Sequence, residues 1–310
     1  MLAATLLALG SAFVHASWNL LIKTSEDRAL AAWGQFLAAA TLSLLGLAVV
    51  GLPGWDALPY LLGTAVVHVA YIEGLVAAYT HGDFSLSYPV ARGGGAVLAA
   101  VGSVVVLGDH LPPWAWVAIA VAGAGLISLR SGRAVPAADD VVLGPLGHPD
   151  DPTPGPAPGG DVTPVTDERR ALAFAALTAA CIATYTVIDS AGARAVDSGV
   201  SYGLASVAAG GLAISAGNLA RPSRRARAGA LRTGWPRHLA GGLGTTLAYT
   251  MVLVAVRHAP VGYVTMLRES SVVIGALVGW LVLREGLGGR RLASSGVILA
   301  GLLLLVAAGR

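Results

Sequence analysis

The sequence carries ten separate apolar runs, each close to the length that a helix needs to cross a bilayer. They cover residues 2–22, 30–51, 57–79, 84–107, 113–130, 170–188, 199–219, 238–256, 261–283 and 292–308. About 20 residues of helix span the hydrocarbon core of a membrane. Because no water is available there to satisfy free backbone groups, open and irregular chain is excluded. We therefore predict an all-α integral membrane protein of ten transmembrane helices.

The charge content supports burial in lipid. Only 12% of residues are charged, against about 25% in a typical soluble domain. The net charge of +3 does not indicate nucleic acid, because the arginines lie between apolar runs and not along one helical face. The single Cys181 lies inside an apolar run and has no spaced Cys or His partners for zinc. We expect the bilayer as a partner, and no nucleic acid, cofactor or metal.

A segment of different character divides the chain. Residues 131–169 are rich in Gly and Asp and contain eight prolines, at positions 136, 145, 149, 152, 154, 156, 158 and 164. Such a composition cannot form an apolar core, so we interpret the segment as a disordered linker. It separates a first unit of five helices (residues 1–130) from a second (residues 170–310).

The two units share residues in the same order. Arg92 precedes Asp109 by 17 residues, and Arg268 precedes Glu285 by the same interval. Gly125 and Gly301 each follow that acid by 16 residues. Looser matches pair Ala16-Ser17-Trp18-Asn19 with Ala183-Thr184-Tyr185-Thr186, and Ala70-Tyr71 with Ala248-Tyr249. Since each unit has an odd number of helices, the second copy would enter the membrane from the opposite side. This predicts two inverted five-helix repeats, an architecture of secondary transporters.

Two of these motifs resemble a known family. The stretch from His15 to Lys23 resembles the first helix of EamA-type members of the drug/metabolite transporter superfamily, and Leu107-Gly108-Asp109 resembles a family motif that usually ends in Glu. The resemblance covers all but the linker. It implies a five-plus-five carrier with a central cavity that moves metabolites such as amino acids, often outward and with protons. The long linker, Asp109, and arginines at positions 92 and 268 depart from the family pattern.

Basic residues between the runs predict an orientation. Connections after odd-numbered runs hold 15 Lys and Arg residues, six of them in residues 221–237, while the remaining connections and termini hold three. The positive-inside rule places the first group in the cytoplasm and both termini outside. The family resemblance implies cytoplasmic termini instead. Either way, we expect a multi-pass protein of the plasma or inner membrane.

Two arginines inside apolar runs are the first candidates for substrate binding. Arg92 and Arg268 occupy equivalent runs, and a charge at membrane depth costs about 2.5–3.5 kcal/mol on insertion scales. A guanidinium pair could grip a carboxylate or phosphate. The alternative is that each arginine forms a structural ion pair with an internal acid such as Glu73 or Glu269.

Other polar side chains could line the cavity or carry protons. Glu73 and Glu269 are candidate proton carriers, with His15 and His68 as candidate relays; static ion pairs or helix-to-helix hydrogen bonds explain them as well. Aromatic and amide side chains could contact substrate or simply pack; these are Trp18, Asn19, Tyr71, Tyr185 and Tyr249. Pro89 and Gly93-Gly94-Gly95 beside Arg92 predict a break or bend in that helix, although tight packing also explains the glycines.

The leading hypothesis is a secondary active transporter that moves a small polar metabolite, amino acid-like or an organic anion, by alternating access. We expect efflux, with protons as a candidate coupling ion. A lipid-carrier flippase would share this architecture. An intramembrane enzyme is disfavoured, because the sequence has neither His-Glu-x-x-His nor Gly-x-Ser-x-Gly. A scaffold would not require buried arginines in both units. The pattern leaves open the substrate and the oligomeric state.

Overall fold

The computed structural model describes residues 1–23, 27–81, 84–128, 168–271, 273–274 and 289–308. Within these ranges the chain contains helices and no strands, so the predicted all-α class is confirmed. The expected linker over residues 131–169 and Glu285 of the second repeat motif lie outside the described residues, apart from the helical start at Glu168.

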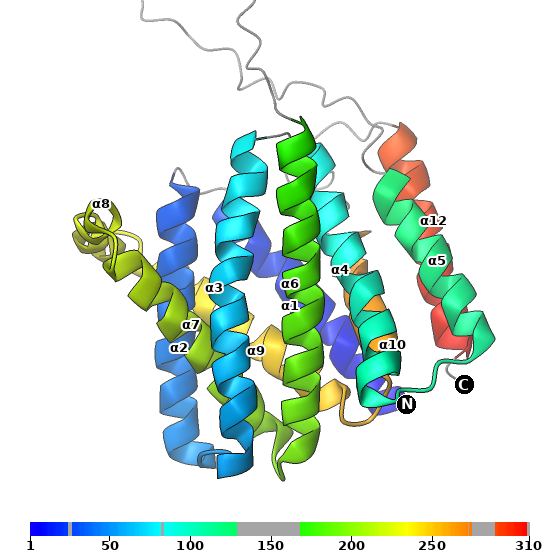
Figure 1. Ribbon diagram of the computed structural model, residues 1–310, viewed down its shortest axis with the longest axis horizontal. Helices are drawn as coiled ribbons and strands as arrows, with labels where there is room; N and C mark the ends of the chain where they lie inside the picture. The colour runs from blue at the N-terminus through cyan, green and yellow to red at the C-terminus, as the bar shows by residue number, and fades with distance from the viewer. Residues whose placement is uncertain (24–26, 82–83, 129–167, 272, 275–288, 309–310) are drawn as a thin grey trace, which may run out of the picture.

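Long helices stand roughly side by side in the bundle (Figure 1). In the first unit they are α1 Leu2–Lys23, α2 Arg28–Val50, α3 Leu58–His81 (preceded by the short η1 Trp55–Ala57), α4 Phe84–Leu107 and α5 Pro113–Ser128. In the second unit they are α6 Glu168–Ala195, α7 Gly199–Leu219, α9 Trp235–Ala255, α10 Val261–Arg268 and α12 Gly289–Ala308, with the short α8 Pro222–Arg225 and η4 Ala228–Arg232 between α7 and α9. Helix therefore occupies each of the ten apolar runs over the residues that the structure describes.

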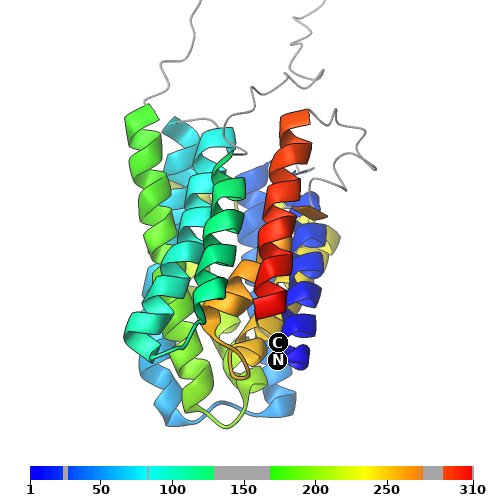
Figure 2. The same ribbon diagram turned by 90° about the vertical axis from the view of Figure 1, so that its right-hand side faces the viewer.

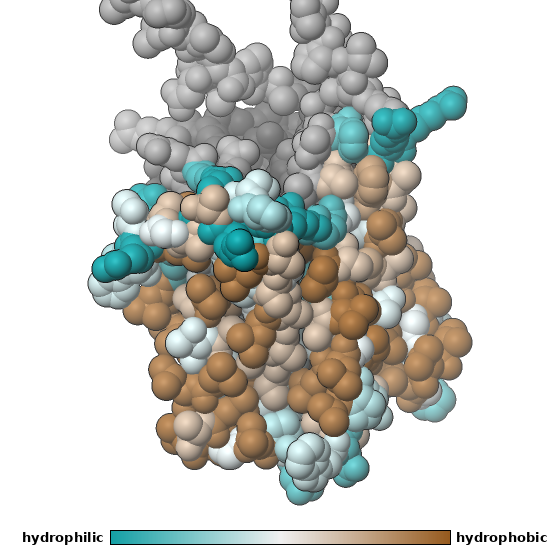
Figure 3. Space-filling model, turned by 60° about the vertical axis from the view of Figure 1, so that its left-hand side comes forward, coloured by the Kyte–Doolittle hydropathy of each residue, from teal (hydrophilic) through white to brown (hydrophobic). Residues whose placement is uncertain are grey.

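Within the described residues, six helices are long and apolar enough to cross a membrane. These candidate spans are Ala29–Val50, Trp55–Leu75, Val90–Leu107, Arg169–Ala195, Gly199–Leu219 and Trp235–Ala255. Shorter apolar helices cover Leu2–Trp18, Pro113–Gly125 and Gly296–Ala307. The outer surface fits a bilayer: Figure 3 shows a broad hydrophobic band with hydrophilic residues gathered toward the end opposite the termini. Exposed apolar side chains such as Leu45, Val66 and Val105 belong to this lipid-facing surface.

Two expected helices differ in detail from the prediction. The helix around Arg92 continues without interruption through Pro89 and the three glycines. A Cβ on Gly95 would lie 2.7 Å from Ile182 of α6, which shows that this glycine permits close packing of α4 on α6. The break lies instead in the expected helix at residues 261–283. There α10 ends at Arg268, Glu269 is a turn residue, and helix resumes at Ser270.

Helices of the two units interleave, and the pairs that pack together correspond. α6 packs on α3 and α4, while α1 packs on α9 and α10; α2 packs on α9, while α7 packs on α3. Helices α5 and α12 contact each other at the edge of the bundle (Figure 2). Their repeat-matched glycines face the partner helix reciprocally. A Cβ on Gly125 would lie 2.8 Å from the Ile298 amide, and one on Gly301 would lie 2.6 Å from that of Ala122.

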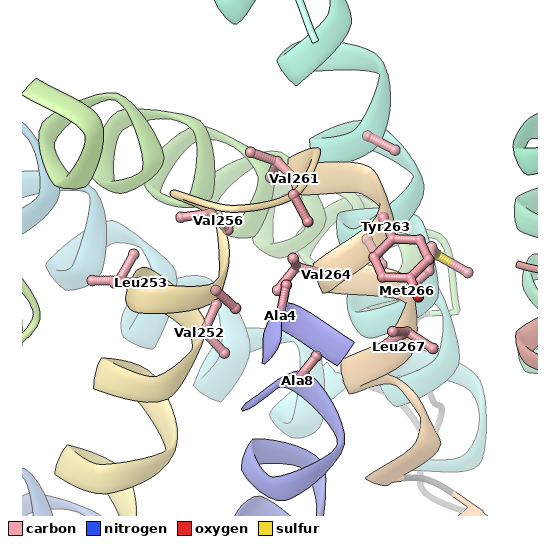
Figure 4. Close-up of a cluster of buried hydrophobic side chains, with 14 of the residues drawn as sticks. Ala4, Ala8, Val252, Leu253, Val256, Val261, Tyr263, Val264, Met266 and Leu267 are labelled. Carbon is pink, nitrogen blue, oxygen red and sulfur yellow. The ribbon is translucent and has the colours of Figure 1, made fainter. Parts of the chain in front are cut away.

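The end of the bundle that holds both termini is tightly packed. Ala4 and Ala8 of α1 lie among Val252 and Leu253 of α9 and the buried face of α10 (Figure 4). Tyr202, Met266 and Leu267 in this cluster have at most 1% of their surface exposed. This hydrophobic cluster closes the terminal end of the bundle. We call it the terminal-end cluster.

Candidate functional site

The Leu107-Gly108-Asp109 motif anchors the terminal end. Gly108 adopts φ +69°, a left-handed conformation that glycine tolerates and that ends α4. The carboxylate of Asp109 then pairs with Arg194 at 2.7 Å and accepts the backbone N–H of Val261 at 2.7 Å. That N–H belongs to the first residue of α10, where a helix favours negative charge. The motif thus ties α4, α6 and α10 together, and it lies apart from the arginines inside the bundle.

Arg92 forms an ion pair with Glu269. Its Nη2 lies 2.8 Å from Oε1 of Glu269, and the two side chains are 11% and 5% exposed. The pair joins α4 to the turn that follows α10, so the structure brings together two candidates from different units. Of the alternatives that the sequence left open, internal ion pairing therefore describes Arg92, and Glu269 is its partner.

Arg268 has a different environment. Its Nη2 lies 3.5 Å from Nδ1 of His15 on α1, a long and weak contact, and its guanidinium lies 5.8 Å above the ring of Tyr249 on α9. His15 in turn contacts Trp18 edge to face, with 4.7 Å between the ring centroids. No carboxylate of the described residues forms an ion pair with Arg268.

Several buried polar atoms around Arg268 make no hydrogen bond within the described part of the chain. They are Nε of Arg268, Oε2 of Glu269, the hydroxyls of Ser270 and Ser271, and Nε1 of Trp18. Unpaired polar atoms of this kind each cost about 1–3 kcal/mol and are rare in folded proteins. Four of the five belong to consecutive residues at the end of α10. We call residues Arg268 to Ser271 with Trp18 the unpaired polar cluster.

Aromatic side chains meet beside this cluster. His68 of α3 stacks on Tyr185 of α6 with a centroid separation of 4.4 Å, and Tyr71 contacts Tyr185 at 5.8 Å. Tyr249 contacts both His68 and Tyr185 at 6.3 Å. The sequence-predicted tyrosines therefore come together from α3, α6 and α9, and Tyr249 connects them to Arg268.

One predicted site residue, Glu73, lies elsewhere. Glu73 is 39% exposed, and its carboxylate pairs with Arg221 and Arg224 beyond the end of α7, so the structure does not place it with the arginines of the interior. Asn19 and Pro89 lie in α1 and α4. One pocket formed by described residues is small and apolar. It lies at the terminal end between Leu111, Pro260 and Tyr263, away from the expected central cavity.

The sequence analysis missed Asp189. This residue of α6 is fully buried and accepts hydrogen bonds from four hydroxyl groups, those of Thr64, Tyr202, Ser206 and Tyr249. The expected apolar run ended at residue 188, directly before this acid. The available signal was the run of small residues, Ser190-Ala191-Gly192-Ala193, that continues past this single Asp, since α6 extends to Ala195.

Comparison with known proteins identifies the relationship of the second unit. Residues 169–307 match the model of the EamA-like transporter family. A solved structure titled "Crystal structure of protein" superimposes with a TM-score of 0.70 over 98% of each chain, at 15% sequence identity. That likeness shows a shared fold. No curated protein matches the sequence.

Proposed function

Residues 169–307 of this membrane protein match the EamA-like transporter family, and we propose that the protein is a secondary active transporter that moves a small metabolite carrying a carboxylate and an ammonium group. The observation that carries the proposal is the unpaired polar cluster. Arg268 offers a free N–H donor, Glu269 a free carboxylate oxygen, and Ser270 and Ser271 two hydroxyls. Complementary groups on a ligand would satisfy all of them.

The position of the cluster fits alternating access. α10 begins at the terminal end, and Arg268 is its eighth residue, or about 12 Å along the helix at 1.5 Å per residue. The terminal-end cluster closes that side of the site. Broken helices whose ends supply free polar groups are typical of transporter binding sites. In this scheme the substrate reaches Arg268 from the opposite end and leaves once the terminal end opens.

A duplicated architecture would supply the two states. The corresponding helix pairs of the two units and the reciprocal packing of Gly125 and Gly301 support two inverted five-helix repeats. Exchange of the conformations of the two repeats would then open one end and close the other. With the basic connections in the cytoplasm, the site described here opens inward, which favours efflux across the plasma or inner membrane.

Uptake into liposomes tests this function. Purified protein is reconstituted and loaded separately with unlabelled glutamate, threonine, lysine, succinate or glycerol 3-phosphate, and counterflow of the labelled compound is measured. We expect exchange of at least one amino acid and none of succinate, because a dicarboxylate leaves Oε2 of Glu269 unsatisfied. Exchange of succinate alone would favour the organic-anion alternative.

Matched arginine variants show whether the site carries the exchange. Arg268→Gln removes the buried guanidinium, whereas Arg237→Gln removes one that is exposed at the start of α9. We expect loss of exchange in the first and normal exchange in the second. Failure of the folded wild-type protein to exchange any compound, together with translocation of a fluorescent phospholipid, would replace the transporter by the lipid flippase.

A further inference from the structure

Asp189 is a buried carboxylate that lies among the packed helices. The proposed site does not use it. Its Oδ2 accepts from the Thr64 hydroxyl of α3 at 2.9 Å and from the Tyr249 hydroxyl of α9 at 2.6 Å. Its Oδ1 accepts from Tyr202 and Ser206 of α7, both at 3.0 Å. Four helices are therefore tied together at one side chain, which has no exposed surface.

Within the described residues Asp189 forms no ion pair, and its side-chain hydrogen bonds come from hydroxyl groups. The helices packed on α6 bring other titratable groups toward it: His68 and Tyr60 from α3, Tyr202 from α7 and Tyr249 from α9. Among the charged residues on these elements, Arg92 pairs with Glu269, Arg194 with Asp109, and Glu73 of α3 with Arg221 and Arg224, while Asp56 belongs to η1. Burial without a cation favours the neutral form of a carboxylic acid, whereas donated hydrogen bonds favour the ionised form, so opposing effects act on this group and either state is accessible to it.

His68 is connected to Asp189 by a chain of correctly directed donors. Nδ1 of His68 lies 2.9 Å from the backbone carbonyl of Thr64, which can only accept, so Nδ1 carries the proton. The same Nδ1 lies 3.0 Å from the Thr64 hydroxyl, which itself donates to Asp189. A proton taken up at Nε2 of His68 can therefore displace the Nδ1 proton to Thr64, and the Thr64 hydroxyl proton passes to Oδ2 of Asp189.

We propose that Asp189 is the proton-binding carboxylate of this transporter, loaded through His68 and Thr64, and that its protonation loosens the terminal end. This inference rests on the proposed function for its role in coupling. Tyr249 joins the two sites, since its hydroxyl bonds to Asp189 while its ring lies under Arg268. The ligand of Arg268 and the proton of Asp189 would then act on one shared side chain.

The chemistry of protonation explains the loosening. Ionised Asp189 accepts from four hydroxyls, whereas a neutral carboxyl has one oxygen that must itself donate. Protonation through Thr64 reverses the bond to that hydroxyl, because Oδ2–H then donates to it, and the bonds donated by Tyr202 and Ser206 of α7 and by Tyr249 of α9 lose their charged acceptor and weaken. Asp189 lies six residues before the end of α6, about 9 Å from the terminal end. The bonds that weaken are thus those nearest the terminal-end cluster.

Infrared titration of the protein in lipid detects the proton directly and needs no substrate. We expect a carboxylic acid C=O band that appears as pH falls from 9 to 5, is absent in Asp189→Asn, and persists in Glu73→Gln. Tyr249→Phe, which removes one donor and adds none, should shift the frequency of that band. A band unchanged in Asp189→Asn would overturn the proposal, as would an unchanged band frequency in Tyr249→Phe if Asp189→Asn does not fold.

Hydrogen exchange at one pH tests the loosening. An asparagine side chain cannot accept hydrogen bonds as a carboxylate does, so Asp189→Asn should raise amide exchange at least threefold in peptides from residues 58–66 and 196–206, with Glu73→Gln as the matched control. Equal exchange in the wild-type protein and both variants would refute the loosening. Because neither measurement involves transport, both outcomes stand even if the liposome experiment finds no substrate, and the two proposals fail independently.

Discussion

Two buried polar regions lie on either side of Tyr249, and they differ in how completely their hydrogen bonds are made. Around Asp189, four hydroxyls satisfy one carboxylate. Around Arg268, buried donors and acceptors have no partner among the described residues. A complete network stabilises one arrangement of helices, whereas an incomplete one is stabilised when a ligand supplies the missing hydrogen-bond partners. The difference assigns structure and switching to the first region, and binding to the second.

Arg92 and Glu269 form an ion pair within the binding region, and we expect that breaking this pair has the largest effect on stability. Arg92→Gln leaves the carboxylate of Glu269 buried without its cation, which typically costs about 3–5 kcal/mol. We expect a large loss of thermal stability in detergent. Arg92→Gln with Glu269→Gln should recover most of it. If the double variant is as unstable as the single one, the arginine stabilises the bundle by other contacts.

Arg268 should show the opposite balance between stability and transport. Lysine keeps the charge at this position but loses the planar fork that holds two oxygens. Arg268→Lys should weaken the apparent affinity for the exchanged amino acid about tenfold, or roughly 1.4 kcal/mol, with little change in thermal stability. The measurement is counterflow over a range of concentrations. A variant that loses stability and keeps its affinity would make Arg268 structural.

A substitution at Tyr202 tests the complete network around Asp189, because Tyr202 bonds to that carboxylate and is not part of the unpaired polar cluster. Tyr202→Phe removes one hydrogen bond to Asp189 and fills the same space. Typical values for a hydrogen bond to a charged acceptor and for one between membrane helices predict that the free energy of unfolding falls by about 1 kcal/mol. Thermal unfolding should report it, and the apparent affinity of exchange should stay within twofold of wild type. If the free energy lost from binding exceeds the free energy lost from folding, the Asp189 network also contributes to binding, and the two regions do not have separate roles.

The sequence predicted the helices far better than the pairing of their polar groups. Apolar length located helix in the described part of every run, because burial in lipid acts on each segment separately. The partner of Arg92 lies 177 residues away, and no local pattern encodes such a distance. Asp189 was lost for a related reason: hydropathy treats an acid as a helix end, although four distant hydroxyls compensate for its burial. Glu73 was misplaced because helical position alone does not show that Arg221 and Arg224 cover it.

Glu73 provides the smallest expected effect and the reference for the others. Its pairs with Arg221 and Arg224 are between 34% and 45% exposed on every side chain, and exposed ion pairs contribute about 0.2–1 kcal/mol because water and salt screen them. Glu73→Gln should therefore lower thermal stability only slightly, with the difference vanishing in about 1 M salt, and should leave exchange and its pH dependence unchanged. If Glu73→Gln instead abolishes the pH dependence of exchange, the proton is carried at this partly exposed acid. The two buried regions would then differ in binding and packing, and Asp189 would have no role in proton coupling.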